Sequence, residues 1–260
     1  MTEPTSIPQR KKLDLLRTRK GNPLISALTA YDYAVARLLD EAGIEIILVG
    51  DSLGMMVFGH EDTTQVTVEM MAHHVKACRK GVRKALLVAD LPYRSYDTPE
   101  AAVETARLLA DAGADAVKLE GGKEVLRQTD SILLSGIAVI GHIGMLPQQV
   151  NHEGGYKKKG KTELEAKALL SDALELTATG VTAIVLENIA EDVCAEITSS
   201  VTIPTIGIGS GDDCDGQILV INDLLGSYPW FCPGFAKPLA NLASETSIAI
   251  RAFIDGLDKA

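Results

Sequence analysis

Four carboxylates follow short apolar runs of this sequence. The run at 46–49 precedes Gly50 and Asp51, and comparable runs end at Asp90, Glu120 and Glu187. Runs of this length suit buried strands and are too short for typical helices. In parallel α/β folds, chemistry collects at the C-terminal edge of the strands. These carboxylates are therefore predicted to converge on one site.

Three of these carboxylates, Asp51, Asp90 and Glu120, come at the ends of successive predicted strands, so they should be neighbours. A cluster of like charges repels and perturbs its own pKa values. A bound cation relieves that repulsion, and all-oxygen ligands suit a hard ion such as Mg²⁺. The alternative for any single strand-end aspartate is a helix N-cap or turn residue.

Strand parity places Lys118 and Glu120 on the same side of one predicted strand, because residues two apart face the same way. Val117 and Leu119 point to the other side. A lysine within an apolar strand is costly to bury without a partner. It is either half of a structural ion pair or a cation that holds an anionic substrate group.

Glu187 and His142 each end a further apolar run. A carboxylate set into an apolar wall can act as a general base. The alternative for Glu187 is a cap of the helix predicted from Ala190. A lone histidine such as His142 is more often a hydrogen-bonded structural residue than a catalyst. The glycines of 207–211 lack the spacing of a dinucleotide loop, because Asp212 replaces the last glycine, and they indicate a tight turn or close ligand approach.

Strands and helices alternate about eight times along the chain. The strands, predicted over 24–29, 45–49, 85–89, 116–119, 138–141, 182–186, 202–206 and 217–221, are apolar throughout. That composition is typical of parallel strands covered on both faces. We predict the α/β class and a (β/α)8 TIM barrel with a short N-terminal helix. A doubly wound open sheet is the alternative. One barrel domain is expected over 1–260, with 1–20 as an N-terminal extension and helix.

Bulk properties exclude several classes of protein. The length of 260 residues fits one such barrel, and the net charge of −10 with a single basic run at 157–161 argues against nucleic acid as a partner. No apolar run approaches the roughly 20 residues of a membrane span, and no secretory signal is recognisable. The scattered cysteines, Cys78, Cys194, Cys214 and Cys232, predict buried free thiols in a cytoplasmic protein.

Taken together, several motifs resemble the ketopantoate hydroxymethyltransferase family. They run in the same order from about Lys20 to the predicted C-terminal helix: Thr29-Ala30-Tyr31-Asp32, Val49-Gly50-Asp51-Ser52-Leu53-Gly54-Met55, Ala89-Asp90-Leu91-Pro92, Val117-Lys118-Leu119-Glu120-Gly121-Gly122, Gly141-His142-Ile143-Gly144, Gly154-Gly155-Tyr156-Lys157 and Asp215-Gly216-Gln217-Ile218-Leu219-Val220. The chain differs from the family pattern at 188–190, at Ser210 and over 226–237.

The resemblance implies a barrel of the phosphoenolpyruvate mutase/isocitrate lyase superfamily. It implies transfer of a hydroxymethyl group from 5,10-methylenetetrahydrofolate, as co-substrate, to 3-methyl-2-oxobutanoate, giving 2-dehydropantoate in pantothenate biosynthesis. It further implies Mg²⁺ and a cytoplasmic homodecamer. The implied positions are the metal ligands Asp51, Asp90 and Glu120, the substrate contacts Asp51, Ser52, Asp90, Lys118 and His142, and the catalytic base Glu187.

These positions suggest a mechanism as a hypothesis. Mg²⁺ chelates the ketoacid and stabilises its enolate, Lys118 adds positive charge, and Glu187 removes the C3 proton. Two alternatives remain open. A Mg²⁺-dependent carbon–carbon lyase acting on a 2-oxoacid would share the carboxylates, and a non-catalytic barrel would only bind ligands or partners.

Overall fold

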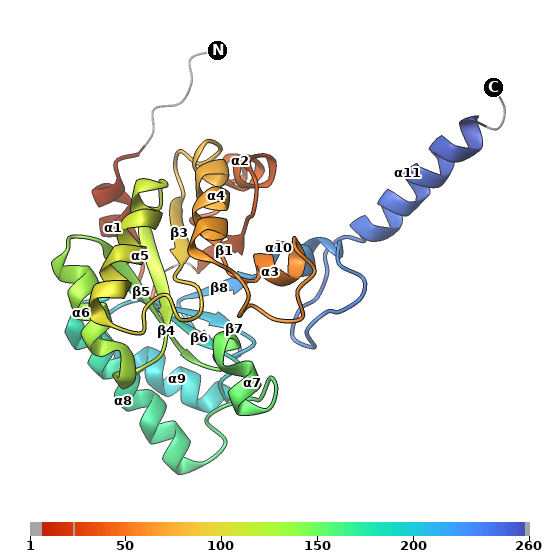
Figure 1. Cartoon of the computed structure of the whole chain (residues 1–260). Helices are drawn as coiled ribbons and strands as arrows, with labels where there is room; N and C mark the ends of the chain where they lie inside the picture. Colours follow the sequence, from red (N-terminus) through yellow and green to blue (C-terminus); the bar gives the residue numbers. More distant parts are fainter. Residues whose placement is uncertain (1–6, 23, 258–260) are drawn as a thin grey trace. The chain divides into compact units, whose positions relative to one another are not determined.

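Eight parallel strands form a closed barrel in the computed structural model, which describes residues 7–22 and 24–257 (Figure 1). The strands are β1 (Ile25–Thr29), β2 (Ile46–Val49), β3 (Leu86–Asp90), β4 (Ala116–Glu120), β5 (Ala138–Gly144), β6 (Ala183–Glu187), β7 (Thr205–Ile208) and β8 (Gly216–Leu219). Each strand from β1 to β7 pairs in parallel with the next along the chain. The predicted (β/α)8 barrel is confirmed, and the open-sheet alternative is wrong.

Helices connect the strands. The longer ones are α1 (Gln9–Arg17), α2 (Tyr33–Ala42), α4 (Val68–Arg79), α5 (Pro99–Asp111), α6 (Leu126–Leu134), α8 (Glu163–Thr179), α9 (Glu191–Ser200) and α11 (Leu242–Leu257). The short ones are α3 (Leu53–Met56), η1 (Lys123–Val125), η2 (Pro147–Gln149), α7 (Val150–Glu153) and α10 (Ile221–Leu225). The connection after β2 contains α3, and the connection after β5 contains η2 and α7.

Local chemistry fixes several helix ends. Asp32 and Thr98 cap α2 and α5, since their side chains accept hydrogen bonds from Val35 N–H and Ala101 N–H. Gly43 follows α2 with a φ of 89°, a left-handed conformation that glycine adopts without a Cβ clash. Side-chain caps therefore fix the starts of α2 and α5, and a glycine fixes the end of α2.

Three strand predictions had ends that differ from the observed ones by two or more residues. The fifth strand continues to Gly144 rather than ending at 141. The seventh strand begins at Thr205 rather than at 202, because Pro204 has no N–H to donate to a ladder. The eighth strand was predicted through Ile221, but it ends at Leu219 and Ile221 begins α10.

The barrel interior is filled from alternate positions of the strands. These side chains are Ile25, Ala27, Ile46, Leu48, Leu86, Val88, Ala116, Ile140, Ala183, Val185, Ile206 and Ile218, and Leu16 of α1 joins them. The same parity leads from Ala116 to Lys118, from Ile140 to His142 and from Val185 to Glu187. The interior face of the strands thus becomes polar at its C-terminal end.

The chain divides into two compact units, one ending at Ile218 and the other beginning at Leu219. Within the second unit, Leu239 N–H donates to Leu224 O and Ala243 N–H donates to Gly226 O. One barrel domain over 1–260 stays a prediction. Residues 1–6 of the expected N-terminal extension lie outside the described residues, and its helix is α1. Within 7–22 and 24–257, no helix is both long and apolar enough to cross a membrane.

Cysteine burial differs from the prediction at one position. Cys78, Cys194 and Cys214 are buried free thiols, and the Cys194 and Cys214 sulfurs lie 3.1 Å apart. Cys232 is exposed, because it falls in the segment before α11, so the expectation that all four thiols are buried is wrong.

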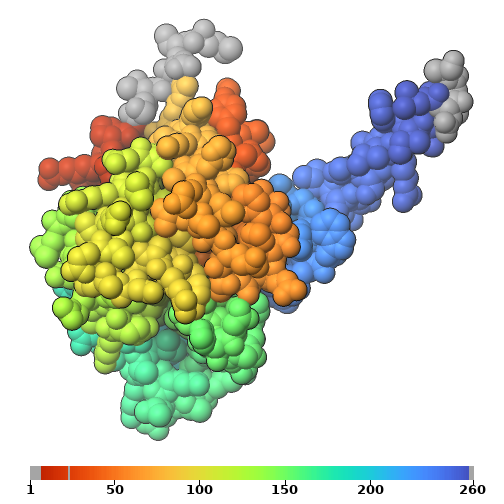
Figure 2. Space-filling view, in the orientation of Figure 1, coloured from red at the N-terminus to blue at the C-terminus, as the bar shows by residue number. Residues whose placement is uncertain are grey.

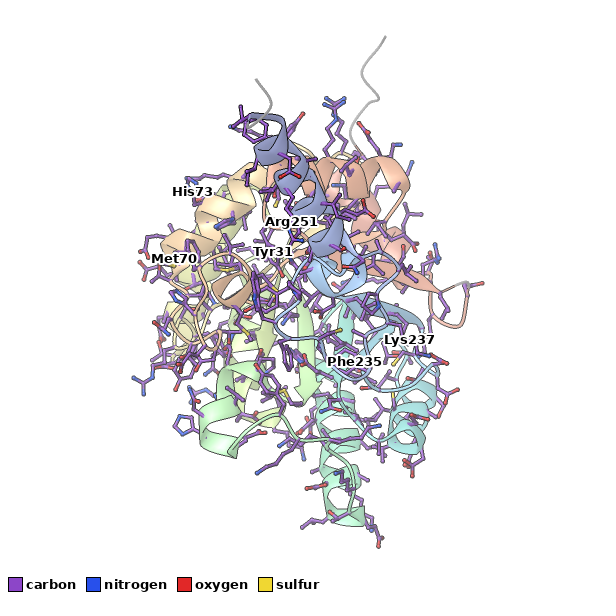
Figure 3. All side chains as sticks on the ribbon, turned by 90° about the vertical axis from the view of Figure 1, so that its right-hand side faces the viewer. Tyr31, Met70, His73, Phe235, Lys237 and Arg251 are labelled. Carbon is purple, nitrogen blue, oxygen red and sulfur yellow. The ribbon has the colours of Figure 1, made fainter. Side chains whose placement is uncertain are left out.

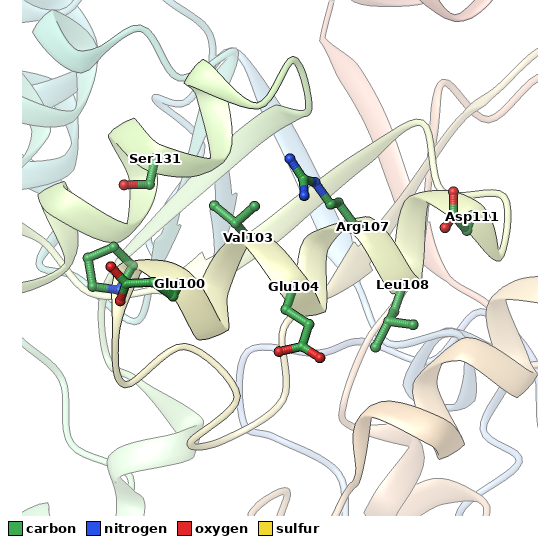
Figure 4. Close-up of a pocket in the computed structure, with 8 residues that line it drawn as sticks. Glu100, Val103, Glu104, Arg107, Leu108, Asp111 and Ser131 are labelled. Atoms are coloured by element: carbon green, nitrogen blue, oxygen red, sulfur yellow. The ribbon is translucent and has the colours of Figure 1, made fainter.

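A groove of 480 Å³ lies along the outside of α5, with Ser131 of α6 at its edge (Figure 4). Glu100, Glu104, Arg107 and Asp111 give it a charged lining. None of the residues predicted to do chemistry lines this groove.

Candidate active site

A buried ion pair connects the ends of β3 and β4. Lys118 Nζ lies 2.9 Å from Asp90 Oδ1, and both side chains are almost wholly buried. The other oxygen of that carboxylate, Asp90 Oδ2, accepts a hydrogen bond from Asp51 N–H at 3.1 Å. Asp90 is thus a partner of Lys118 and of the β2 end, rather than a helix cap.

Asp51 lies in the turn that follows β2, one residue out of register with the interior positions Ile46 and Leu48. Gly50 occupies the interior position instead, and a Cβ there would meet Ser52 Oγ at 3.0 Å and Asp90 Oδ2 at 3.5 Å. Burial, and then the negative charge of Asp90, raise the pKa of Asp51 to about 7. The absence of a side chain at Gly50 lets these groups approach one another.

Glu120 completes the carboxylate group from β4. Burial, reinforced by the charge of Asp51, raises the pKa of Glu120 well above its usual range. For Lys118, burial opposes the charged form, but Asp90, Glu120 and Asp51 outweigh it and raise the pKa of Lys118. One lysine therefore faces three buried carboxyl groups, and ionisation of all three would leave an excess of negative charge.

His142 of β5 lies between Lys118 and Glu187. Lys118 Nζ is 3.2 Å from His142 Nδ1, and an ammonium group can only donate, so Nδ1 accepts. The proton of the neutral ring is then on Nε2, which lies 3.2 Å from Glu187 Oε2. Burial, and then the charge of Lys118, lower the pKa of His142, which keeps the ring neutral.

Ser52 belongs to a separate chain of hydroxyl groups beside this cluster. Its Oγ lies 2.9 Å from Tyr31 OH, and Thr29 Oγ1 donates to the same phenol at 2.9 Å. Tyr31, labelled in Figure 3, comes from the turn after β1 and is buried. Ser52 is thereby held at the C-terminal ends of β1 and β2.

The backbone turns sharply directly after Glu187. Asn188 has a φ of 49°, a left-handed conformation that asparagine tolerates better than most residues. Ser210 fastens this turn, since its Oγ donates to Leu186 O at 2.8 Å and accepts from Ile189 N–H at 3.0 Å. Positive φ values at Gly209 and Gly211 confirm the tight turn predicted for 207–211.

Sequence reasoning missed Gln148 and Tyr96, which join the same network. Gln148 contacts both Asp51 and Glu120, and Tyr96 OH donates to Gln148 Oε1 at 2.6 Å. Both come from connections after strands, where no periodic pattern indicates which way a side chain points.

Two connections meet near the surface by the C-terminal strand ends, the one after β2 and the one after β5. Figure 2 shows these segments, orange and green, in contact on one face of the molecule. Asn151 Nδ2 donates to Asp62 Oδ2 at 2.8 Å, and Tyr156 OH contacts Met55 Sδ at 4.0 Å. Burial, and then the charges of Glu187 and other carboxylates, raise the pKa of Tyr156 to about 12.

Comparison with known proteins decides the family. The sequence model of ketopantoate hydroxymethyltransferase matches residues 10–260. The chain belongs to the ketopantoate hydroxymethyltransferase family. It is 48% identical over 242 residues to the 3-methyl-2-oxobutanoate hydroxymethyltransferase of Acetivibrio thermocellus, covering 92% of this chain and 86% of that protein. The enzyme of the same name from Trichodesmium erythraeum is 51% identical over 238 residues, 90% of each chain.

The barrel is also similar to solved structures of low sequence identity. A phosphonopyruvate hydrolase in complex with oxalate and Mg²⁺ is 14% identical, with a TM-score of 0.63. The match covers 95% of this chain and 87% of that one. At this identity the likeness concerns the fold alone. A 2,3-dimethylmalate lyase, named as a member of the phosphoenolpyruvate mutase/isocitrate lyase superfamily, is similar in fold as well, at 15% identity and a TM-score of 0.63.

The donor set fits the divalent ion expected for this family. Asp51 Oδ2 and Glu120 Oε2 accept hydrogen bonds from Gln148, and no hydrogen bond within the described residues occupies Asp51 Oδ1 or Glu120 Oε1. The raised pKa values of Asp51 and Glu120 are a second point in favour, because a bound cation would offset the charge that their ionisation adds. Across the described part of the chain, no three His, Cys, Asp or Glu side chains are grouped to chelate one ion together. Mg²⁺ needs only one or two carboxylates, since it keeps several waters.

The structure brings the predicted site residues together. Asp51, Asp90, Lys118, Glu120, His142 and Glu187 form one connected group, and Ser52 follows Asp51. Glu187 is not a helix cap, because Ala190 is the N-cap of α9 and makes no side-chain cap bond, while the Glu187 carboxylate faces His142. The roles of these residues as metal ligands, substrate contacts and base stay predictions.

Proposed function

We propose that this chain transfers a hydroxymethyl group from 5,10-methylenetetrahydrofolate to 3-methyl-2-oxobutanoate and so produces 2-dehydropantoate for pantothenate biosynthesis. The names of its relatives and the family match support the proposal. The proposal depends most on the position of Glu187. Its carboxylate lies beside Nε2 of His142, and Lys118, which is surrounded by the buried carboxyl groups, lies beside Nδ1 of the same ring. A proton acceptor and an anion-binding group then face one substrate.

A divalent ion, proposed to be Mg²⁺, would be held by Asp51, Asp90 and Glu120, directly or through water. When bound, it would polarise the keto group of the substrate and offset the negative charge of the cluster. The Mg²⁺ and oxalate named for the similar phosphonopyruvate hydrolase support the proposal of a divalent ion and a small acid as ligands of such a barrel.

Lys118 is proposed to hold the anionic end of the ketoacid. Its Nζ is fixed between Asp90 and His142, both almost fully buried, so the cation has a defined position before substrate binds. A preorganised charge in a water-poor site stabilises developing negative charge more strongly than a solvated one. Asp51, Ser52, Asp90 and His142 are the other proposed substrate contacts.

Glu187 is proposed to remove the proton from C3 of the ketoacid. The C3–H bond breaks, its electron pair moves toward C2 and the keto oxygen, and the resulting enolate carbon attacks the methylene carbon of the folate. The two C–N bonds of that methylene carbon break, and one water supplies the hydroxyl group of the product. The C3 proton and the second proton of the water go to the two folate nitrogens, and tetrahydrofolate leaves. His142, with Nε2–H toward Glu187, orients the carboxylate. The ring does not compete for the proton, because its Nδ1 accepts from Lys118 and its pKa is lowered.

The family resemblance also supports a cytoplasmic homodecamer. Its subunit number can be measured by light scattering of the purified full chain. A monomer at micromolar concentration would contradict that part of the proposal.

The test is an incubation with 3-methyl-2-oxobutanoate, 5,10-methylenetetrahydrofolate and Mg²⁺, followed by detection of 2-dehydropantoate. Product is expected in the complete mixture, and none without the folate or with excess chelator. A carbon–carbon lyase would instead cleave a 2-oxoacid without folate, and a non-catalytic barrel would give no product and no proton exchange at C3. Absence of 2-dehydropantoate from the complete mixture would overturn the proposal.

A further inference from the structure

Gln148 of η2 is buried to 1% exposure and bonded to two of the three proposed metal ligands. Its Nε2 donates to Asp51 Oδ2 at 2.8 Å, and its backbone N–H donates to Glu120 Oε2 at 3.0 Å. The second amide proton goes to Leu91 O at 2.9 Å. One residue therefore connects the ends of β2, β3 and β4.

We propose that Gln148, oriented by Tyr96, is a positioning residue that sets the separation and orientation of the Asp51 and Glu120 carboxylates for a divalent ion. The inference rests on the proposed function, because it assigns Gln148 a role toward the ion proposed there. It adds a residue that neither strand parity nor the family motifs indicated.

The orientation of the Gln148 amide is determined by its partners. Two of them, the Asp51 carboxylate and the Leu91 carbonyl, can only accept, so they require the NH₂ side of the amide. The remaining Oε1 accepts from Tyr96 OH at 2.6 Å. A flipped amide would set its oxygen against Asp51 and its NH₂ against the phenol. The accepting groups of Asp51 and Leu91 therefore select the amide orientation, and Tyr96 holds it by donating to Oε1.

Tyr96 is suited to this task because it remains a donor. Its hydroxyl is 3.3 Å from Glu120 O and 2.6 Å from Gln148 Oε1, and the shorter contact is the stronger one. Burial raises the pKa of Tyr96, so the phenol keeps its proton over the usual working range. All three polar groups of the Gln148 side chain are thus satisfied.

Gln148 engages one oxygen of each carboxylate and leaves the other to an ion. Groups that hold metal ligands in this way affect metal affinity by about 10–100-fold when removed. A purely structural glutamine would contribute to folding stability without changing the metal dissociation constant. The two readouts separate a positioning role from a structural one.

The experiment uses Mn²⁺ as the probe, with the free ion measured by electron paramagnetic resonance. Gln148→Met keeps the volume and the backbone N–H to Glu120 but removes both amide donors. We expect its Mn²⁺ dissociation constant to rise about 10–100-fold, with the urea midpoint recorded alongside. Gln149→Met makes the same chemical change at the neighbouring position, whose side chain has no role in the site. Its dissociation constant should stay within about twofold of that of the parent.

Tyr96→Phe removes one oxygen and leaves every atom of Gln148. It should raise the dissociation constant less than Gln148→Met does, and it should have no further effect when combined with Gln148→Met, because Tyr96 acts through that amide. If Gln148→Met does not fold, Tyr96→Phe decides: a threefold or larger rise supports the inference, and a value within twofold of the parent overturns it.

A folded Gln148→Met with parental Mn²⁺ affinity overturns the positioning role and leaves the proposed function standing. A parent chain that binds no Mn²⁺ overturns the metal assignment, and the role of Gln148 with it. The two failures are therefore distinguishable in one titration series.

Discussion

Replacing Asp51 with asparagine should stabilise the metal-free protein while removing its function. Asp51 is buried among carboxylates, and the rise of its pKa from 3.8 to about 7 means that its ionised form is unfavourable in the folded state. Asparagine is isosteric and carries no charge. Its side-chain oxygen can still accept the hydrogen bond from Gln148 Nε2.

The size of the effect follows from linkage. Between the unfolded pKa of 3.8 and the folded pKa of about 7, the folded chain binds more protons, so the free energy of unfolding falls as the pH rises. The two values differ by about 3, and each pKa unit corresponds to about 1.4 kcal/mol, which gives an upper limit on the order of 4 kcal/mol above pH 7. At pH 5 the folded carboxyl is neutral and most of that penalty is absent.

The assay is urea unfolding with a chelator present, at pH 5 and at pH 8. Asp51→Asn should have a higher free energy of unfolding than the parent. That difference should be larger at pH 8 than at pH 5, by on the order of 3 kcal/mol at most. Asp90→Asn is the matched control with the opposite sign. Asp90 is paired with Lys118 at 2.9 Å, and breaking a buried pair costs about 3–5 kcal/mol, so that variant should be less stable.

Two results would refute this reasoning. One is a lower free energy of unfolding for Asp51→Asn than for the parent at pH 8 without metal. The other is a gain of the same size at both pH values, since the charge of Asp51 would then not be its cause.

Two backbone predictions concern the position of Glu187. Gly144→Ala places a Cβ 2.3 Å from Glu187 O at a φ of +103°. At the control position, Gly136, φ is +87° and the new Cβ would meet no neighbouring atom within 4 Å. Gly144→Ala should therefore lower the free energy of unfolding by about 1–3 kcal/mol more than Gly136→Ala does. Urea midpoints measure the difference, and equal losses would contradict the predicted clash. A β-branched residue is strained at the φ of 49° found at Asn188. Asn188→Val should therefore lower the free energy of unfolding by about 1–3 kcal/mol and slow proton exchange at C3. Asn188→Gly should keep the stability and the exchange rate of the parent. A valine variant as stable as the glycine one would count against strain at this turn.

The barrel and the strand-end group were predictable because both follow from local patterns. Apolar runs of strand length fixed the order of the strands, and parallel neighbours bring their C-terminal ends together. Strand parity then predicted that Lys118 and Glu120 lie on the same face of β4. The contacts agree, because Lys118 pairs with Asp90 and Glu120 accepts from Gln148 N–H within one buried group. Asp51 was expected at the same edge, and it lies there although it follows β2 in a turn. Gly50 has no side chain and leaves room for it.

The remaining parts depend on contacts between distant segments. Gln148 and Asp51 are 97 residues apart, and Tyr96 and Gln148 are 52 apart, so no spacing along the chain relates them. The short helices α3 and α7 lie in long connections whose conformation is set by tertiary contacts, such as that between Asn151 and Asp62. The cap alternative for Glu187 could be excluded only once the N-cap of α9 was known.

The central claim is that Glu187 takes the C3 proton of 3-methyl-2-oxobutanoate beside the carboxylate cluster. Proton NMR in D₂O with Mg²⁺ and without folate follows the loss of the C3 signal directly. We predict exchange with the parent chain, and none with Glu187→Gln, while that variant still binds the ketoacid in a Mg²⁺-dependent manner. Undiminished exchange in Glu187→Gln would contradict the account.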